Sequence, residues 1–262
     1  MLSLLVVLVV AALPMTRSVS LSSRLNRIYT LCKNSKIIAD VGSDHGLLAL
    51  KLASNEHVNH VYCIDSSLLA LKNGIYQNMQ KFDNEVKNRL EIRNGDGLSP
   101  IVKEKKKVET VILAGLGAHT INSILNVDLA ALGCKQVIIQ PFPCNFKDLL
   151  PLYQSILNQH SKWSISDMAI DYEKRQFYLT SVFSHVPEQA SNNHENLLTL
   201  NDFPLHKIED KSVLFKYLKK QQDLLTVKRQ GFVHDGVDGT AEYKYLLLIL
   251  KQIEGMLPTD RT

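Results

Sequence analysis

The chain has 262 residues, of which 45% are hydrophobic and 21% are charged, and its formal net charge is +4. This balance is that of an ordinary globular protein, so it excludes disorder across the whole chain, and the small excess of cations excludes a histone-like polycation. The length allows one α/β core with a small second domain, and cations gathered on one face could still bind a polyanion.

The first 20 residues are a candidate leader. Residues 1–13 are almost wholly apolar, which is too short to span a bilayer but typical of a signal-peptide core. Residues 16–36 are rich in serine and basic residues, and the first acidic residue is Asp40, which is typical of a transit peptide. We interpret the two stretches as a leader for an organelle, such as a plastid, that is entered through the secretory route. The alternatives are a simple secretory signal or a mis-set start codon on a cytoplasmic protein. We expect a monomer without stable membrane association once the leader is removed.

Strands and helices then alternate. Short β-branched or apolar runs predict strands, and the segments after most of them carry helical periodicity. Two later segments alternate apolar and polar residues around a turn, which predicts an antiparallel hairpin. The pattern predicts an α/β, Rossmann-like parallel sheet with a terminal antiparallel hairpin, the layout of class I methyltransferases. The predicted strands are residues 37–41, 60–64, 90–93, 110–114, 136–140, 164–172 and 176–184, and the predicted helices are residues 47–53, 66–82, 119–126 and 149–159.

A small helical domain follows the sheet domain. The sheet domain is expected over residues 21–186, a polar linker over 187–201 and the last domain over 202–262. Apolar residues recur with helical spacing in residues 211–230 and 245–257, which predicts a helical hairpin with coiled-coil-like packing. Between residues 205 and 230 there are seven Lys or Arg and three Asp or Glu. This segment is either a grip for a polyanion or a solvated helix face.

No metal site is expected. The four cysteines have no CxxC spacing, and the nine histidines show no ligand spacing. Three of the cysteines lie in or beside apolar runs, so we expect buried free thiols.

Three carboxylates follow three successive predicted strands. Asp40 lies in a loop with glycines, and an acidic, glycine-containing loop suits a sulfonium nucleoside better than a phosphate cradle does. Asp65 can accept hydrogen bonds from ribose hydroxyls or cap a helix, and Asp96 can take an adenine amino group or shape a turn. Because ligands lie beyond the carboxyl ends of parallel strands, we expect one crevice that also includes Gly115 and Gln140.

Five short motifs resemble the bacterial tRNA (adenine(22)-N1)-methyltransferase family. They are LSSRL at 21–25, ADVGSDH at 39–45, GDGL at 95–98, AGLG at 114–117 and QP at 140–141. The resemblance implies S-adenosylmethionine as the methyl donor and tRNA as the substrate. It implies donor contacts from Asp40, Gly42, Ser43, Asp65, Asp96, Gly97, Ala114 and Gly115, with Gly115 also bordering the target adenine. It implies a catalytic group of Asp44, His45 and Gln140. We further expect substrate contacts from Arg24, Gly117, Phe142, Lys216, Lys219 and Lys220.

The chain departs from the family pattern at two positions. Ala118 stands where the family has glycine, and Phe142 stands where it has asparagine, so an amide is replaced by a stacking face. A leader is absent from bacterial relatives, which suggests a eukaryotic, organellar version of the enzyme.

The implied chemistry needs alignment and negative charge near the base. Adenine N1 has an in-plane lone pair, so we expect Asp44 to face the exocyclic amino group while Gln140 or His45 fixes the orientation of the base. The alternative for His45 is a turn or packing residue. Two other functions stay open: methylation of another RNA or a small molecule, and an inactive RNA-binding relative.

Overall fold

The computed structural model describes residues 19–185 and 197–258. The leader prediction falls almost wholly outside the described residues, as does most of the predicted linker. Among the helices that are described, none is long and apolar enough to cross a membrane.

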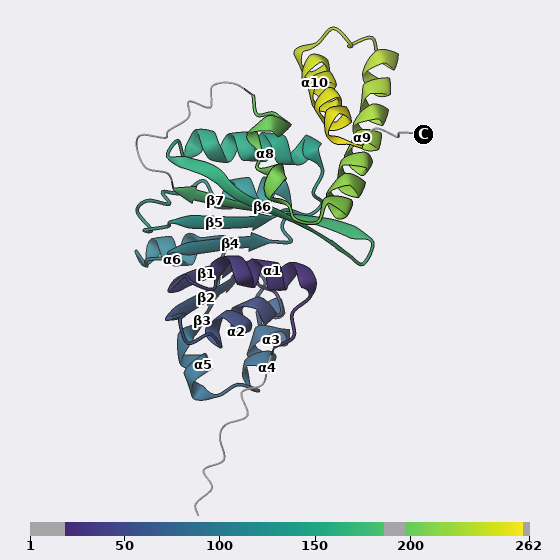
Figure 1. Ribbon diagram of the computed structural model, residues 1–262. Coiled ribbons are helices and arrows are strands. Elements are labelled where there is room, and N and C mark those ends of the chain that lie inside the picture. The colour runs from purple at the N-terminus through teal and green to yellow at the C-terminus, as the bar shows by residue number, and fades with distance from the viewer. Residues whose placement is uncertain (1–18, 186–196, 259–262) are drawn as a thin grey trace, which may run out of the picture.

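One seven-stranded sheet runs through the molecule in the order β3-β2-β1-β4-β5-β7-β6 (Figure 1). The first five of these strands are parallel, β7 is antiparallel to β5, and β6 is antiparallel to β7. This arrangement confirms the predicted Rossmann-like sheet with its terminal hairpin. The strands are β1 Ile37–Val41, β2 His60–Asp65, β3 Leu90–Asn94, β4 Thr110–Ala114, β5 Gln136–Gln140, β6 Trp163–Glu173 and β7 Gln176–His185.

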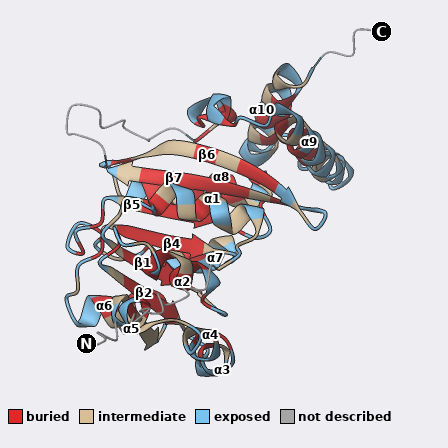
Figure 2. Ribbon diagram, turned by 60° about the horizontal axis from the view of Figure 1, so that its bottom comes forward, coloured by how far each residue is buried: buried red, intermediate tan, exposed pale blue. Residues whose placement is uncertain are grey.

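Helices cover both faces of the sheet, because neighbouring strand residues point to opposite sides. On β4, Ile112 packs into one apolar cluster, while Val111 and Leu113 pack into the other. The first cluster includes α1 Ser23–Cys32, α2 Leu47–Ala53, α3 Leu68–Asn73, α4 Ile75–Met79 and α5 Asn84–Arg89. The second includes α6 Ser99–Lys103, α7 Ala118–Ile124 and α8 Phe146–Gln159. Figure 2 shows that the strands are mostly buried, whereas the helices around them have both buried and exposed residues.

The helix predicted over residues 66–82 is in fact two helices, α3 and α4, which meet at Gly74. A Cβ atom at Gly74 would lie 2.7 Å from both the carbonyl oxygen of Asp44 and the Cα of His45. The break therefore lets the backbone pass close beneath the loop that carries two predicted catalytic residues. Asn78 in α4 supports the same loop, because its side-chain amide donates to the His45 carbonyl at 3.1 Å.

The last part of the chain forms the predicted helical hairpin. Its helices, α9 Lys211–His234 and α10 Ala241–Met256, pack against each other and extend beyond the sheet (Figure 1). Two short 3-10 helices, η2 Leu200–Asp202 and η3 Leu205–Lys207, precede them. The hairpin shares its core with the sheet: the Tyr217 hydroxyl donates to the Cys144 carbonyl at 2.7 Å, and Gln221 accepts from the Phe146 amide at 2.9 Å. The first turns of α9 are thereby fixed to the start of α8.

All four cysteines are buried and free, as the sequence predicts. Burial raises the pKa of the Cys63 and Cys134 thiols to about 12. These thiols stay protonated at neutral pH and act as small apolar groups.

Candidate active site

The predicted site residues follow the carboxyl ends of neighbouring strands. Asp65 at the end of β2 is paired with Asn94 at the end of β3, and Ala114 at the end of β4 is paired with Gln140 at the end of β5. Since β1 lies between β2 and β4, the carboxylates and glycines of the motifs form a row along one edge of the sheet. Strands in such a row are separated by about 4.8 Å.

A cavity of about 520 Å³ opens at the middle of this edge. We call it the crevice. Its floor is the loop between β1 and α2 together with the end of β4, and its walls come from α1 and from the turn between β6 and β7. Eight of the predicted site residues line it: Arg24, Asp40, Gly42, Ser43, Asp44, His45, Ala114 and Gly115.

Asp40 is the most deeply buried carboxylate of the crevice, with 4% of its surface exposed. Burial raises the pKa of its carboxyl group to about 6, although hydrogen bonds from the Ser43 hydroxyl, at 2.7 Å, and from the Ala49 backbone amide work against this rise. The negative charge of nearby Asp65 adds a smaller increase to the pKa. An ionised Asp40 therefore lacks a cation in the described structure and would gain from one.

The loop after β1 is held in an unusual backbone conformation. Gly42, Asp44 and Gly46 all have positive φ angles, of 75°, 46° and 66°, and for Asp44 this conformation is costly because the residue has a Cβ atom. Its backbone amide donates to the Asp65 carboxylate at 3.0 Å. The Asp44 and His45 side chains come within 3.5 Å of each other and are 63% and 66% exposed. Both predicted catalytic side chains thus lie at the mouth of the crevice and are free to meet a large substrate.

Asp65 is not the cap of α3, because Ser67 is the N-cap residue of that helix, and its contact with a ribose stays a prediction. Its two carboxylate oxygens accept from the backbone amides of Asp44 and Ser67, at 3.0 and 2.8 Å. A carboxylate has about four acceptor positions, so two remain for a ligand. Asp65 therefore links the β1 loop to the start of α3 and still has lone pairs for ribose hydroxyls.

Asp96 and Gly97 lie outside the crevice. They line a separate cavity of about 300 Å³ between the β3–α6 loop and α7. The expectation of a single crevice is wrong in this respect, because the loop after β3 turns toward α6 and α7 and forms its cavity with them. Gly97 has a φ of 53°, and a Cβ atom there would lie 2.8 Å from Ile124. Only glycine fits where this loop passes α7.

Gln140 is fully buried beneath the crevice. Its amide oxygen accepts from the Arg24 guanidinium at 2.9 Å, and its amide nitrogen donates to the Thr180 hydroxyl at 2.8 Å. The amide is thus already engaged on both sides. In this geometry Gln140 positions Arg24. The sequence had instead suggested that Gln140 contacts the base directly.

Phe142 and Tyr178 form an aromatic pair beside Arg24. Their rings are nearly parallel, at 21°, with centroids 5.5 Å apart. The Arg24 guanidinium lies over the Tyr178 ring at 4.8 Å, and 38% of Phe142 is exposed. The pair offers a flat apolar surface next to the crevice.

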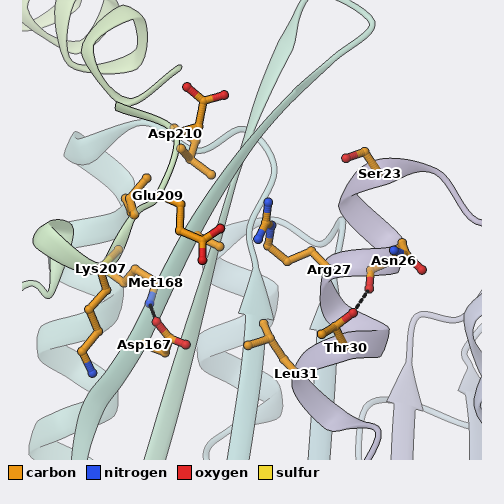
Figure 3. A pocket seen from close by; sticks show the side chains of 13 residues that line it. Ser23, Asn26, Arg27, Thr30, Leu31, Asp167, Met168, Lys207, Glu209 and Asp210 are labelled. Carbon is orange, nitrogen blue, oxygen red and sulfur yellow. Dashed lines mark hydrogen bonds between the residues drawn. The ribbon is translucent and has the colours of Figure 1, made fainter. Parts of the chain in front are cut away.

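Helix α1 is fixed to the sheet by two arginines that are one turn apart. Arg24 reaches Gln140 on β5, and Arg27 forms an ion pair of 3.0 Å with Asp171 on β6. Figure 3 shows Arg27 extending from α1 into a neighbouring cavity of about 310 Å³, which α1 shares with β6 and with the segment before α9. This second attachment holds the wall of the crevice in place.

Eight residues that line the crevice are outside the predicted set, and three of them, Gly46, Leu47 and Leu48, directly follow the predicted loop. The other five are Ser22, Leu25, Leu116, Glu173 and Lys174. Ser22 and Leu25 belong to the LSSRL motif but carry no chemical signal of their own. The two hairpin residues lie in a turn that was predicted only as a turn. The sequence feature that could have drawn attention to this turn is the absence of glycine and asparagine, which are the favoured residues in two-residue turns.

The basic residues of α9 are largely solvent-facing. Lys216, Lys219 and Lys220 are exposed; Lys219 lies 3.7 Å from Asp223, and the Lys220 ammonium lies 5.6 Å from the centre of the Phe177 ring. Phe177 belongs to the β6–β7 hairpin, whose turn reaches the crevice. The N-terminal half of α9 therefore lies near the same end of the sheet as the crevice (Figure 1).

Comparison with known proteins gives consistent similarities. The profile of the methyltransferase domain family matches residues 21–180. The tRNA (adenine(22)-N(1))-methyltransferase of Bacillus subtilis (strain 168) is 27% identical over 125 residues, which are 46% of this chain and 49% of that protein. The match thus spans about half the length of this curated relative.

Two solved structures have a similar fold over nearly the whole chain. M. capricolum TrmK in complex with S-adenosyl-homocysteine has a TM-score of 0.67 and 23% identity, covering 90% of this chain and 96% of that one. The B. subtilis M1A22 tRNA methyltransferase TrmK has a TM-score of 0.69 and 18% identity, covering 92% and 100%. Both support the α/β architecture with its C-terminal helices.

Proposed function

This chain belongs to the methyltransferase domain family, and from this premise we propose that it transfers the methyl group of S-adenosylmethionine to N1 of an adenine in tRNA. The curated relative that it matches is a tRNA (adenine(22)-N(1))-methyltransferase, so position 22 is the proposed target. One observation carries the proposal: strand-end carboxylates form a row along one edge of the sheet, and at this edge opens a crevice that contains Asp40 and has Asp44 and His45 at its mouth.

The residues at the sheet edge fit the methyl donor. Asp96, Asp65 and Asp40 lie at or near the ends of three neighbouring strands, in the order in which an adenine, a ribose and a charged tail would lie along the edge. The backbone beyond β4 is accessible as well, since a Cβ atom at Gly115 or Gly117 would meet nothing within 4 Å. When bound, the donor supplies an electrophilic methyl group on a positive sulfur, and carboxylates suit this charge.

The mouth of the crevice suits an unpaired adenine. N1 lies on the pairing edge of the base, so the base must leave any helix before it can react. Its lone pair forms the new bond to carbon, the carbon–sulfur bond breaks with its electron pair going to sulfur, and the ring becomes cationic. Asp44 can accept a hydrogen bond from the exocyclic amino group and stabilise this charge, while His45 borders the base.

The aromatic pair and α9 suit the rest of an RNA substrate. The exposed face of Phe142 can stack on a base, a contact worth about 1–3 kcal/mol that does not depend on sequence. Tyr178 and Arg24 support that face from behind. Lys216, Lys219 and Lys220 can contact phosphates along the tRNA backbone, which makes binding depend on salt.

A single assay tests the proposal against its alternatives. The full chain is incubated with methyl-labelled donor and unmodified tRNA, and any labelled base is mapped by digestion and primer extension. N1-methyladenosine at position 22 is the expected product. Label in small molecules but not in RNA would indicate a small-molecule enzyme, and tRNA binding without consumption of the donor would indicate an inactive RNA-binding relative.

We also propose that the protein acts in an organelle. The support is the composition of the residues before α1, an apolar stretch over residues 1–13 followed by a short stretch with Arg17 and three serines. Fusion of the first forty residues to a fluorescent reporter should deliver it to a plastid-like compartment, whereas diffuse cytosolic fluorescence would contradict the assignment.

A further inference from the structure

Two polar atoms in the wall of the crevice lack a partner. Within the described residues, the buried side-chain oxygens without a hydrogen bond are Ser22 Oγ, Asn122 Oδ1 and Glu173 Oε2. Ser22 and Glu173 both line the crevice. An unpaired buried oxygen is unfavourable by roughly 1–3 kcal/mol, and more for a charged group. Such an atom beside a substrate cavity is explained most simply if a ligand donates to it.

Glu173 belongs to a turn that is itself held in a costly conformation. Glu173 pairs with Gln176, so the β6–β7 hairpin closes through Lys174 and Arg175 alone. These two residues have φ angles of 49° and 64°. Two-residue turns with two positive φ angles favour asparagine and glycine, because a Cβ atom is unfavourable there. The presence of two cationic side chains in this unfavourable conformation suggests that their charges have a function, such as contact with an anionic substrate.

The turn lies on the substrate side of the crevice. In the sheet, β7 and β6 follow β5, whereas β1, β2 and β3, which lead to the predicted donor carboxylates, lie on the other side of β4. Lys174 and Glu173 face the crevice from this far side, together with Arg24 of α1. A group that meets Glu173 is therefore more readily part of the acceptor than part of the donor.

We propose that this turn recognises the target nucleotide. Glu173 accepts a hydrogen bond from the exocyclic amino group of the adenine, and Lys174 contacts the phosphate of the same nucleotide. The proposal rests on the proposed function and adds residues to the same site. The amino group has two N–H donors, so Asp44 can take one and Glu173 the other. Methylation at N1 makes the ring cationic and the amino group a stronger donor, so the hydrogen bond to Glu173 strengthens as the reaction proceeds.

The contact would also select the base. Adenine carries a donor at its six position, whereas guanine and hypoxanthine carry an acceptor oxygen there. A carboxylate oxygen repels such an oxygen, and the buried Oε2 of Glu173 has no hydrogen bond to other described residues that would offset this repulsion. We therefore expect Glu173 to exclude purines with a six-oxo group from the crevice.

A double-substitution cycle between protein and RNA tests the contact. One tRNA carries adenosine at the target position and a second carries purine riboside, which keeps N1 but lacks the amino group. For the wild-type protein, loss of the amino group should lower kcat/KM by about 10- to 100-fold. Glu173→Ala should lower kcat/KM by a similar factor on adenosine, whereas on purine riboside its kcat/KM should differ from that of wild type by less than about threefold.

Controls separate this contact from folding and from the donor site. Glu173→Gln keeps the shape of the side chain, and Gln176→Ala changes the opposite side of the same turn. Glu173→Gln should lose turnover while the affinity for S-adenosyl-homocysteine, measured by calorimetry, stays within about threefold; Gln176→Ala should change neither. Lys174→Gly relieves the positive φ, so it should raise Tm while it raises KM for tRNA.

The outcomes distinguish the two proposals. If Glu173→Ala lowers kcat/KM by the same factor on adenosine and on purine riboside, the contact is overturned. Methylation of tRNA by the wild type would still leave the proposed function intact. A parallel loss of donor affinity in Glu173→Gln would move Glu173 to the donor site and also overturn the contact. A wild-type protein that methylates no tRNA adenine would overturn both proposals together.

Discussion

Replacement of Asp40 by asparagine should make the donor-free protein more stable and weaken the binding of the donor. Burial raises the pKa of this carboxyl group to about 6, from an ordinary value of 3.8. Between these two pH values the folded protein keeps a proton that the unfolded chain has lost. The free energy of unfolding therefore falls as the pH rises through this window and stays lower above it.

The size of the effect follows from the two pKa values. A difference of about two pH units corresponds to roughly 3 kcal/mol at neutral or higher pH. Roughly half of this is already lost at about pH 5, and the other half is lost between about pH 5 and about pH 8. Asparagine has only one acceptor oxygen for the Ser43 hydroxyl and the Ala49 amide, which costs about 1 kcal/mol. The Asp40→Asn protein should thus be about 2 kcal/mol more stable than wild type at about pH 8 and nearly equal at about pH 5.

Urea denaturation of the donor-free proteins at these two pH values measures the difference, and calorimetry with S-adenosylmethionine measures the binding. The donor affinity of wild type should fall as the pH drops below about 6, because the carboxylate is then protonated, and the affinity of Asp40→Asn should be low and independent of pH in that range. If the Asp40→Asn variant is less stable than wild type at high pH, or binds the donor as tightly as wild type does, Asp40 is not a buried carboxylate that the positively charged donor stabilises.

Three other substitutions test the substrate side. Asp44→Ala should keep donor affinity within a few-fold and lower turnover by about two orders of magnitude, as measured by single-turnover methyl transfer; equal losses in both would relocate Asp44 to the donor site. Phe142→Ala should raise KM for tRNA by about 10-fold or more without changing donor affinity, whereas Phe142→Tyr, which keeps the stacking face, should behave like wild type. Simultaneous replacement of Lys216, Lys219 and Lys220 by glutamate should reduce the slope of log affinity for tRNA against log salt concentration by about two to three. An unchanged slope would show that these lysines only form a solvated helix face.

The strands of the sheet could be predicted closely because their sequences are short apolar runs that end at glycine or proline. The bounds of β4 and β5 agree with the prediction at both ends. Helices α5 and α6 were missed because, at six and five residues, they are too short for helical periodicity to show. Helix α1 was missed for another reason. Its basic, acid-poor sequence was read as part of a transit-like stretch, although Ile28 and Cys32 are buried against the sheet.

The donor side of the site could be predicted better than the substrate side. Asp40, Asp65 and Asp96 each follow a strand, so the order of strands in the sequence is enough to place them at one edge. The substrate side depends on pairings over long distances in the chain. Gln140 meets Arg24 across 116 positions, and the turn at Glu173 reaches the crevice only because the hairpin packs beside β5. Spacing in the sequence cannot report such contacts, and a buried oxygen without a partner can be recognised only in three dimensions.

Arg24 connects these two parts of the site. A guanidinium has five N–H donors in a fixed plane, and Arg24 uses one of them on the buried Gln140 while its plane lies over the Tyr178 ring. Both contacts leave the outer edge of the guanidinium without a described partner at the rim of the crevice. A side chain that is held so firmly loses little further entropy when it binds a phosphate. Gln140, which was expected to contact the base, therefore positions Arg24, whose guanidinium can bind the phosphate of the nucleotide.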